Sequence, residues 1–441
     1  MRTVAVLGTG RSGIASAKAL LKEGSRVLLL DEATEATNPE AVSELALAGA
    51  DVRFGVKTPF DFGDAKELVV SPGAAPSSPV VQAALGHGMK VLSEIELAYQ
   101  VAKAPIVAIT GTNGKSTTTV MTYLAFRGAR LNVVLCGNIH GSGYPEVPLT
   151  QAASESPADA VLVAEVSSFH FDFTHAFKPK AAAITNITQD HLDRHGTVEA
   201  YRAAKMRIFE NQDASDLAVI PNDDPLFTRP SGPRIRTFGA TGADAEVLAD
   251  GVRIDGQTIS AAAFPFKGVH NLRNAAVAML LAQGFGVPIK ASMKGLQEFK
   301  GLQNRMEVVA EKGGVTVINN SMCTNPDAVV ASSGSLSQRQ HLLIGGVDKD
   351  LDFAPLRRYL ESSPHRAYIY GRDGRSIKDA LGTDGPVFEN MPEAFQQAIQ
   401  AAKPGEVVML APGCASFDEF KDFVDRGNVF RKLAKEWSAS K

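Results

Sequence analysis

Short apolar runs rich in β-branched residues alternate with longer segments of helical periodicity along the whole chain. The first five runs cover residues 4–8, 26–31, 51–55, 67–73 and 90–94, and each ends in glycine or an acidic residue. Between the first two runs, SGIASAKALLKEG has apolar residues at helical spacing and ends on Gly24, a residue type that commonly terminates helices. Strands that alternate with helices in this way are typical of parallel sheets built from βαβ units.

Two further blocks repeat this pattern. The second opens at PIVAITGTNGKST (105–117) and continues through the apolar runs NVVLCGN, AVLVAEVSS, AAAITNIT and LAVIPND. A helical segment, NLRNAAVAMLLAQGFG, precedes a third block whose runs are VTVINN, HLLIGGVDK, RAYIYG and EVVMLAPG. We therefore predict an α/β protein of three domains, which cover residues 1–93, 94–299 and 300–441.

Composition adds limits to this picture. The 441 residues, 44% of them hydrophobic, suffice for about three folded domains and exclude bulk disorder. With 45 Lys and Arg against 48 Asp and Glu, the chain lacks the positive excess that nucleic acids or anionic membranes attract, so we expect neither as a partner. Three separated cysteines exclude a disulfide framework and a zinc site. Because no apolar run approaches the roughly 18 residues of a membrane span, and no signal-peptide pattern is present, we expect a cytoplasmic protein.

A glycine pattern follows the first apolar run. Gly8, Gly10 and Gly13 form GxGxxG, and Asp31 ends the next run. Without side chains the backbone can approach a pyrophosphate, the following helix offers N–H donors, and the carboxylate can accept from a hydroxyl group. This pattern alone leaves three interpretations open: a nicotinamide cofactor, another nucleotide linked through a diphosphate, or a purely structural turn.

The strongest motif is TGTNGKST (110–117), which we call the phosphate loop; it follows a predicted strand and opens a predicted helix. The backbone N–H groups of residues 111–116 can form an anion site, Lys115 can reach terminal phosphates, and Ser116 can offer its hydroxyl to Mg²⁺. Ile109 stands where the commonest form of the motif has glycine, so this loop is a shortened variant. Hydride transfer has no need of such a loop, whereas ATP-dependent activation of a nucleotide-linked substrate uses both glycine turns.

Longer motifs extend over nearly the whole chain. They are the phosphate loop, AEVSSFH (164–170), TNITQDHLDRHGTVEAYRAAKMRIF (185–209), HNLRNAAVA (270–278), the region of Arg305, GGVDKDLDF (345–353) and APGCASFDEFKDFVDRGNVF (411–430). In these motifs and their order, the chain resembles the Mur ligases of peptidoglycan synthesis. The resemblance implies a Rossmann-like N-terminal domain that binds a UDP-linked substrate, a central P-loop ATPase-type sheet, and a Rossmann-like C-terminal domain that binds an amino acid.

The resemblance also implies a reaction. In the family, a carboxylate of the UDP-linked acceptor takes the γ-phosphoryl group of ATP, and an amine then displaces phosphate from the acyl phosphate. The SSF, DHLDRHG and SFDEF segments are most similar to those of the family member that adds D-glutamate to UDP-N-acetylmuramoyl-L-alanine. The expected partners are therefore these two small molecules and ATP, and we expect a monomer.

By this resemblance, four residues would carry the chemistry: Lys115, Glu165, His191 and Lys205. Lys115 would neutralise phosphate charge, while Ser116, Glu165, His191 and Lys205 would hold two Mg²⁺ ions. Because an ammonium group cannot bind a metal ion, Lys205 would first be N-carboxylated by CO₂, which requires an unprotonated amine. Apart from the resemblance, Lys205 is typical of an exposed helix lysine in an ion pair, and Glu165 of a residue that caps or pairs.

The same matching assigns residues to three ligands. Nucleotide binding would involve Gly111, Thr112, Asn113, Gly114, Lys115, Ser116, Thr117, Asn271, Asn274, Arg305 and Asn320. The UDP-linked substrate would contact Arg11, Ser12, Asp31, Ser71, Gly73, Asn138, Ser167 and His191. The incoming glutamate would contact Thr324, Lys349, Ser416 and Phe423, which include cationic and hydroxyl donors. Without the resemblance, Asn271 and Asn274 are ordinary helix-capping residues, and Arg305 and Lys349 are surface charges.

The chain departs from the family pattern at several positions. Asn320 and Met322 replace the usual aspartate and lysine of NDSKATN, and Asn304 replaces a histidine before Arg305. Residues 31–33 read DEA where the family has a DTR-like triplet that contacts uracil. These departures fall on contacts to uracil, ribose and glutamate and leave the phosphate chemistry intact.

Other functions remain open at this stage. A sister ligase that adds L-glutamate or another amino acid, and a folylpolyglutamate-type ligase, would keep the ATP site and change the outer domains. A nucleotide-dependent switch or binding protein would keep only the phosphate loop. Glu165, His191 and Lys205 together argue against a switch, which has no use for a lysine at a metal position.

Overall fold

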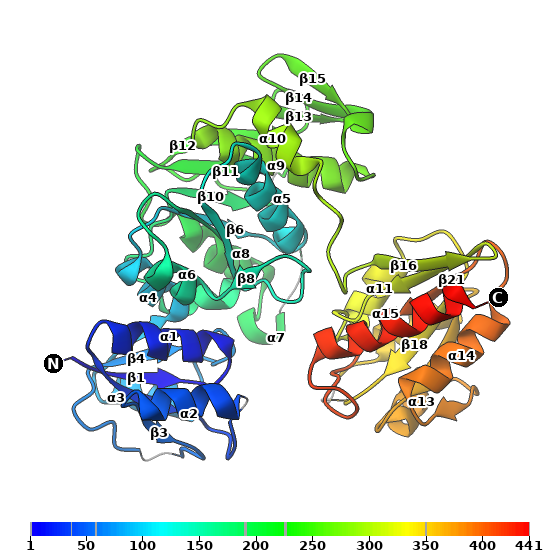
Figure 1. Cartoon of the computed structure of the whole chain (residues 1–441), viewed down its shortest axis with the longest axis horizontal. Helices are drawn as coiled ribbons and strands as arrows, with labels where there is room; N and C mark the ends of the chain where they lie inside the picture. Colours follow the sequence, from blue (N-terminus) through cyan, green and yellow to red (C-terminus); the bar gives the residue numbers. More distant parts are fainter. Residues whose placement is uncertain are drawn as a thin grey trace. The chain divides into compact units, whose positions relative to one another are not determined.

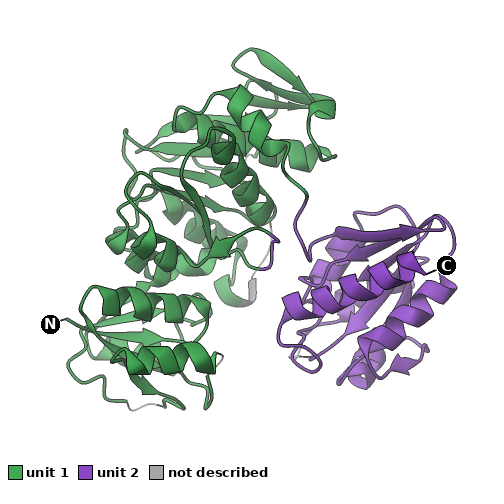
Figure 2. Ribbon diagram, viewed as in Figure 1, with its two compact units in different colours: residues 1–140, 144–300 green, residues 141–143, 301–441 purple. Residues whose placement is uncertain are grey.

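The computed structural model describes residues 2–36, 38–57, 60–188, 192–224, 227–348 and 351–440 and divides the chain into two compact units. The first unit comprises residues 1–140 and 144–300, and the second comprises residues 141–143 and 301–441 (Figure 2). Three sheets, each flanked by helices, make up these units, so the predicted α/β class is confirmed (Figure 1). Within the described ranges, every helix is too short or too polar to span a lipid bilayer.

The first sheet has five parallel strands in the order β3-β2-β1-β4-β5. This is the Rossmann order, in which the switch point between β1 and β4 binds the ligand. The strands coincide with the five apolar runs of the sequence, and their side chains pack into apolar clusters. The elements are β1 (Thr3–Leu7), α1 (Arg11–Lys22), β2 (Arg26–Leu30), α2 (Pro39–Leu47), β3 (Asp51–Arg53), β4 (Glu67–Val70), α3 (Pro79–Gly86), β5 (Lys90–Ser93) and α4 (Glu94–Val101).

The central sheet has ten strands in the order β15-β14-β13-β12-β11-β10-β6-β9-β7-β8. Its strands are β6 (Ile106–Thr110), β7 (Val133–Gly137), β8 (Glu146–Val147), β9 (Val161–Glu165), β10 (Ala181–Ile184), β11 (Leu217–Pro221), β12 (Arg234–Gly239), β13 (Ala245–Leu248), β14 (Gly251–Ile254) and β15 (Gln257–Ser260). Its helices are α5 (Lys115–Gly128), α6 (Leu149–Glu155), α7 (Leu192–His195), α8 (Val198–Met206), α9 (Val269–Gly284), α10 (Ile289–Leu296) and the 3₁₀ segments η1 (Ser168–Phe173), η2 (Arg207–Phe209) and η3 (Ala261–Ala263). Strands β6 to β12 pair in parallel, so their carboxyl ends share one edge of the sheet.

The C-terminal sheet has six strands in the order β16-β17-β21-β18-β19-β20. Only β16 runs antiparallel to its neighbour. The strands are β16 (Glu307–Lys312), β17 (Val315–Asn319), β18 (Gln340–Gly345), β19 (Arg366–Tyr370), β20 (Val387–Phe388) and β21 (Val407–Leu410). The helices are α11 (Pro326–Ser333), α12 (Ala354–Glu361), α13 (Gly374–Leu381), α14 (Met391–Ala401) and α15 (Phe423–Ala439).

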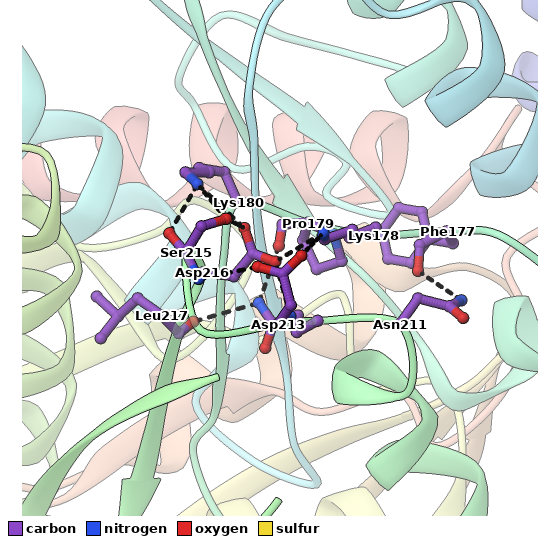
Figure 3. Close-up of polar contacts among 10 residues, drawn as sticks. Phe177, Lys178, Pro179, Lys180, Asn211, Asp213, Ser215, Asp216 and Leu217 are labelled. Carbon is purple, nitrogen blue, oxygen red and sulfur yellow. Dashed lines mark hydrogen bonds and ion pairs between the residues drawn. The ribbon is translucent and has the colours of Figure 1, made fainter. Parts of the chain in front are cut away.

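Charged residues tie β10 to β11 at the amino ends of these strands (Figure 3). Lys178 bonds to Asp213, and the Nζ of Lys180 lies 3.2 Å from Oδ1 of the buried Asp216. The lysines stand just before β10 and the aspartates just before β11. This cluster therefore fixes the pairing of two central strands at the edge opposite the phosphate loop.

Asn304 connects residues 141–143 to the rest of the second unit. The asparagine is fully buried with a positive φ of 60°, and its Nδ2 donates to the carbonyl of Gly141 over 3.1 Å. Its Oδ1 accepts from Nδ2 of Asn319 over 3.0 Å. A Cβ on Gly427 would lie 1.9 Å from this Oδ1, so α15 can pass here only with glycine. Asparagine at position 304 thus has a packing role.

Candidate functional site

The phosphate loop connects β6 to α5 at the carboxyl edge of the central sheet. Gly111 and Gly114 have φ values of 147° and 81°, which disfavour other residues. A Cβ on Gly111 would lie 1.9 Å from Oγ1 of Thr185, and one on Gly114 would lie 2.7 Å from Oδ1 of Asn274. Both glycines are therefore required by their neighbours, Thr185 directly after β10 and Asn274 on α9, as well as by the turn.

Asn186 shapes the same loop. Its carbonyl accepts from the N–H of Thr112 over 2.9 Å, and its Oδ1 accepts from the N–H of Asn113 over 3.0 Å. Two of the N–H groups predicted for an anion site are thus engaged by Asn186, the second residue after β10. Sequence reasoning did not single out Asn186, although it lies within the quoted TNITQDH segment.

The two asparagines of α9 that were predicted to bind the nucleotide have different surroundings in the structure. Asn274 is buried beside the loop, where its Oδ1 accepts from Oγ1 of Thr118 over 3.2 Å. Asn271 is only half-buried, and its Nδ2 donates to the carbonyl of Lys267 over 2.9 Å, a local contact at the start of the helix. Only Asn274 contacts the phosphate loop.

Two lysines converge on the phosphate loop. The Nζ of Lys115 donates to the carbonyls of Gly111 and Thr112 over 3.0 and 2.8 Å. The Nζ of Lys205, which α8 places at 1% exposure, donates to the same Gly111 carbonyl over 2.8 Å and lies 4.5 Å from the ring centre of Tyr201. The interpretation of Lys205 as an exposed helix lysine is therefore wrong, because the side chain is buried at the loop.

Glu165 ends β9 beside the loop strand β6. It is 3% exposed, and its Oε1 lies 3.5 Å from Nδ2 of Asn138, the residue after β7. Its Oε2 is buried and has no hydrogen-bond partner among the described residues. An unpartnered buried carboxylate oxygen fits a hard cation such as Mg²⁺. His191, the other predicted protein ligand of this kind, lies outside the described residues, and no cluster of three His, Cys, Asp or Glu side chains suited to a metal occurs within them.

A cavity of about 540 Å³ lies at the switch point of the first sheet and extends to the central domain. Six of the residues predicted for the UDP-linked substrate line it: Arg11, Ser12, Asp31, Ser71, Gly73 and Asn138. Ser167 is not in this lining. The lining also includes residues that sequence reasoning missed, among them Thr9, Glu32, Ala74, His140 and Pro148.

The glycine turn of the first sheet is held by its own side chains. Oδ2 of Asp31 accepts from the N–H and Oγ1 of Thr9 over 2.8 and 2.6 Å. A Cβ on Gly13 would lie 1.9 Å from the carbonyl oxygen of Gly8, so α1 packs on the turn only with glycine there. Asp31 therefore orders the turn, in addition to the role in ligand binding predicted for it.

Two arginines connect the cavity to the central domain. The guanidinium of Arg11 donates to the carbonyl of Ile139 over 3.3 Å, and burial lowers the pKa of Arg11 although Glu146 opposes this effect. Arg194, on α7, donates to the carbonyl of Ala74 over 3.1 Å and pairs with Asp172 at 2.6 Å. Arg194 was not predicted, since nothing in DHLDRHG indicates that its partner lies in the first domain.

The second unit contains the residues predicted for ribose and glutamate. Asn320 is buried, and its Oδ1 accepts from the N–H of Met306 over 3.2 Å. The guanidinium of Arg305 donates to Sδ of Met322 over 3.4 Å, so the thioether that replaces a lysine orients the arginine next to it. Thr324 is half-buried and Ser416 is buried. Lys349 lies outside the described residues.

A buried arginine orders this part of the second unit. Arg426 is fully buried on α15, where its Nε and Nη2 donate to the hydroxyl and the carbonyl of Ser321, and its Nη1 donates to the carbonyl of Cys414. The hydroxyl of Ser321 in turn donates to the carbonyl of Phe423 over 2.7 Å. Arg426 thus connects the segments that carry Asn320, Ser416 and the predicted Phe423. Sequence reasoning missed this role.

A phosphate loop on one sheet and a cavity at the switch point of another define a nucleotide-binding α/β protein with two separate ligand sites. Three family models match the chain: the MurD-like N-terminal domain at residues 2–93, the Mur ligase middle domain at 109–282, and the Mur ligase glutamate ligase domain at 304–414. The chain belongs to the Mur ligase family.

Curated relatives are similar over almost their full length. The UDP-N-acetylmuramoylalanine–D-glutamate ligase of Pelotomaculum thermopropionicum is 36% identical, over 98% of this chain and 97% of the relative. That of Trichlorobacter lovleyi is 37% identical over 98% of each chain. Among solved structures, MurC from Thermotoga maritima has a TM-score of 0.62 at 18% identity and covers both chains fully. MurF from the same organism, in complex with ADP, has a TM-score of 0.58 at 16% identity over 93% of this chain and 96% of that chain. At these identities, the structural likeness concerns the fold alone.

Proposed function

We propose that this chain joins D-glutamate to UDP-N-acetylmuramoyl-L-alanine in an ATP-dependent reaction of peptidoglycan precursor synthesis. One observation carries the proposal: Asn138 lines the cavity at the first sheet and also contacts Glu165 at the edge that holds the phosphate loop. An acceptor bound in that cavity would therefore end beside the phosphates of ATP. The extensive identity to relatives that bear this ligase name supports the choice of substrates.

The reaction has two steps. A carboxylate oxygen of the acceptor attacks the γ-phosphorus of ATP, the bond to ADP breaks, and an acyl phosphate forms. The unprotonated amine of D-glutamate then attacks the acyl carbon, and phosphate leaves as the amide forms. Because the first step brings two anions together, neutralising the phosphates should supply much of the catalysis. Lys115 provides this charge once its ammonium turns from the carbonyls of Gly111 and Thr112 to the nucleotide.

We further propose that the site takes Mg²⁺, held by Ser116, Glu165, His191 and Lys205. Bound Mg²⁺ would offset phosphate charge as negative charge develops on the leaving oxygen of ADP. The unpartnered Oε2 of Glu165 supports this proposal. The side chains of this protein would present oxygen ligands to the metal at the buried carboxyl edge of the central sheet, while the phosphate loop orients the nucleotide.

Lys205 can serve a metal only as the carbamate, which forms when its neutral amine attacks CO₂ and releases a proton. Two features favour the neutral amine. Burial at 1% exposure disfavours a charged group, and the ammonium of Lys115 shares the Gly111 carbonyl, so a second positive charge would be repelled there. We expect Lys205→Ala to be inactive and to regain part of its turnover with added short carboxylic acids. Unchanged turnover in Lys205→Ala, or an inactive variant that no carboxylic acid restores, would contradict the carbamate.

The three domains divide the ligands in this proposal. Residues 1–93 bind the UDP moiety, residues 94–299 bind ATP and metal, and residues 300–441 bring the amino acid, with Thr324, Lys349, Ser416 and Phe423 around glutamate. Arg305 and Asn320 approach the nucleotide from the C-terminal domain. Because the reaction consumes ATP and a nucleotide-linked precursor, we place it in the cytoplasm.

The test is ADP release in the presence of UDP-N-acetylmuramoyl-L-alanine and one amino acid at a time. We expect release with D-glutamate and little with L-glutamate or a diamino acid. Release only with L-glutamate or a diamino acid would identify a sister ligase instead, and release with a folate acceptor alone would identify a folylpolyglutamate-type enzyme. ATP binding without any amino-acid-dependent release would identify a nucleotide-binding switch.

A further inference from the structure

An open cavity of about 670 Å³ lies at the amino edge of the first sheet, opposite the edge that carries the glycine turn. The charged side chains in its lining are the cations Arg2, Arg26, Lys66 and Lys90 and the acids Asp64 and Glu67. The cavity therefore has an excess of two positive charges, although the net charge of the whole chain is −3. The five residues of β1 span about 16 Å and separate this cavity from the one at the switch point.

The backbone holds the four cations in a row. Arg26 begins β2 and Lys90 begins β5, whereas Arg2 and Lys66 directly precede β1 and β4. The N–H of Arg26 donates to the carbonyl of Arg2 over 2.8 Å, and the N–H of Lys90 donates to the carbonyl of Lys66 over 2.9 Å. Because the strands are neighbours in the order β2-β1-β4-β5, the sheet presents one cation at the start of each of four adjacent strands.

Most of this positive charge is not neutralised by the protein itself. Only Arg2 is paired, through its Nε, which donates to Oε2 of Glu67 over 2.6 Å. The exposed side chains of Arg26, Lys66 and Lys90 form no hydrogen bond or ion pair with any residue that the structure describes. Like charges on neighbouring strands destabilise a sheet, and an anion bound among them would remove that repulsion.

We propose that this cavity binds a small phosphorylated anion with at least two negative charges, through Arg26, Lys66 and Lys90. Phosphate oxygens point in several directions and accept charge-assisted hydrogen bonds from cations on separate strands, whereas a planar carboxylate suits a single guanidinium group. A recessed site with acidic groups in its wall favours a small ligand over a flat anionic surface such as a lipid bilayer. The competing interpretation is that the cations are ordinary solvated surface charges.

Calorimetry with inorganic pyrophosphate at an ionic strength of about 0.15 M tests the proposal. The parent protein carries Arg11→Ala and Lys115→Ala, which remove a cation from each of the two ligand sites described above. We expect this parent to bind pyrophosphate still. Adding Lys66→Gln and Lys90→Gln should raise the dissociation constant about 100-fold, which corresponds to tenfold for each charge-assisted hydrogen bond lost.

Two further variants make the test specific. Lys18→Gln and Lys22→Gln together remove the same charge from the exposed face of α1, and should change the dissociation constant less than twofold. Asp64→Asn removes a negative charge from the cavity wall and should tighten pyrophosphate binding about twofold to fivefold, a gain that a misfolded protein cannot produce. Citrate should bind the parent at least tenfold more weakly than pyrophosphate, because its charges are on carboxylates.

The outcomes differ in what they overturn. If Lys66→Gln and Lys90→Gln weaken binding no more than the α1 variants, or if the parent does not bind pyrophosphate, the site does not exist. Equal affinity for citrate would refute the selection of phosphate. Sedimentation of the parent with phosphatidylglycerol vesicles, lost in Lys66→Gln/Lys90→Gln and without pyrophosphate binding, would assign this edge to a membrane surface instead. None of these measurements uses the acceptor or the amino acid of the proposed reaction, so each conclusion can fail separately.

Discussion

The Nζ atoms of Lys115 and Lys205 both donate to the carbonyl of Gly111, yet the two residues have different tasks in the proposed reaction. Lys115→Ala removes the positive charge from the phosphate loop and keeps its glycines. We expect ADP release to fall about 100-fold to 1000-fold, as when a group that stabilises developing charge is removed, with acceptor affinity within about twofold. Turnover and calorimetry measure the two effects. Near-normal turnover would show that Lys115 does not act on the phosphates.

His170 makes stability depend on pH. Burial lowers its pKa from the usual 6.5 to about 4. Below pH 6.5 the unfolded chain binds a proton that the folded chain refuses until about pH 4, so stability is lost as the pH falls through this window. Relative to His170→Gln, the wild-type free energy of unfolding should decrease by about 2 kcal/mol between pH 7 and pH 5. Urea titrations at both pH values check this, and a constant difference between the two proteins would contradict it.

Sequence motifs indicated in advance residues that the structure brings together when each one stands at the end of a strand. Lys115, Glu165 and Asn138 each follow an apolar run, and parallel pairing brings those runs to one edge. Residues whose partners are distant in sequence could not be predicted in this way. Arg426 binds Ser321 across 105 positions, and no local pattern distinguishes it from a surface arginine.

At the scale of elements, strand prediction succeeded for the long apolar runs of the parallel sheets and failed for several outer strands. All five strands of the first sheet are apolar runs, because helices cover both faces of a parallel sheet. The antiparallel segment from β13 to β15 was missed, since β15 is largely exposed and its sequence QTIS has no apolar run. Strand β16, with the sequence EVVAEK, was missed for the same reason.

Gln212 tests whether the cluster that joins β10 to β11 is structural. Its Nε2 donates to the carbonyls of Pro179 and Leu217 over 2.8 and 3.3 Å, at 5% exposure. Gln212→Leu leaves buried carbonyls unpaired and should cost about 1–3 kcal/mol of unfolding free energy, with kcat unchanged because the site lies at the opposite edge. The control is Lys178→Met, which breaks the exposed pair with Asp213 and a 3.4 Å pair with Asp216, and should cost less than Gln212→Leu. Equal losses in both variants, or a fall in kcat in Gln212→Leu, would refute this assignment.

At the scale of the whole molecule, the residues proposed for one reaction belong to two compact units. Lys115 and Glu165 belong to the first unit, whereas Arg305, Asn320 and Ser416 belong to the second. An acyl phosphate reacts with water as well as with an amine, so the units should close around it when all ligands are bound. Closure has to be driven by ligands that contact both units.

Small-angle scattering tests this closure. We expect the radius of gyration to decrease when the acceptor, a non-hydrolysable ATP analogue and D-glutamate are added together, toward the ~22 Å of a compact chain of 441 residues. Lys115→Ala is the matched control. Because this variant should bind the nucleotide more weakly, most of its molecules should keep the radius of gyration of the ligand-free protein. The same data give the particle mass, for which a monomer of 46.7 kDa is expected. An unchanged radius at saturating concentrations of all three ligands would mean that the units already stand in their reactive arrangement, and that water is excluded by movements of loops alone.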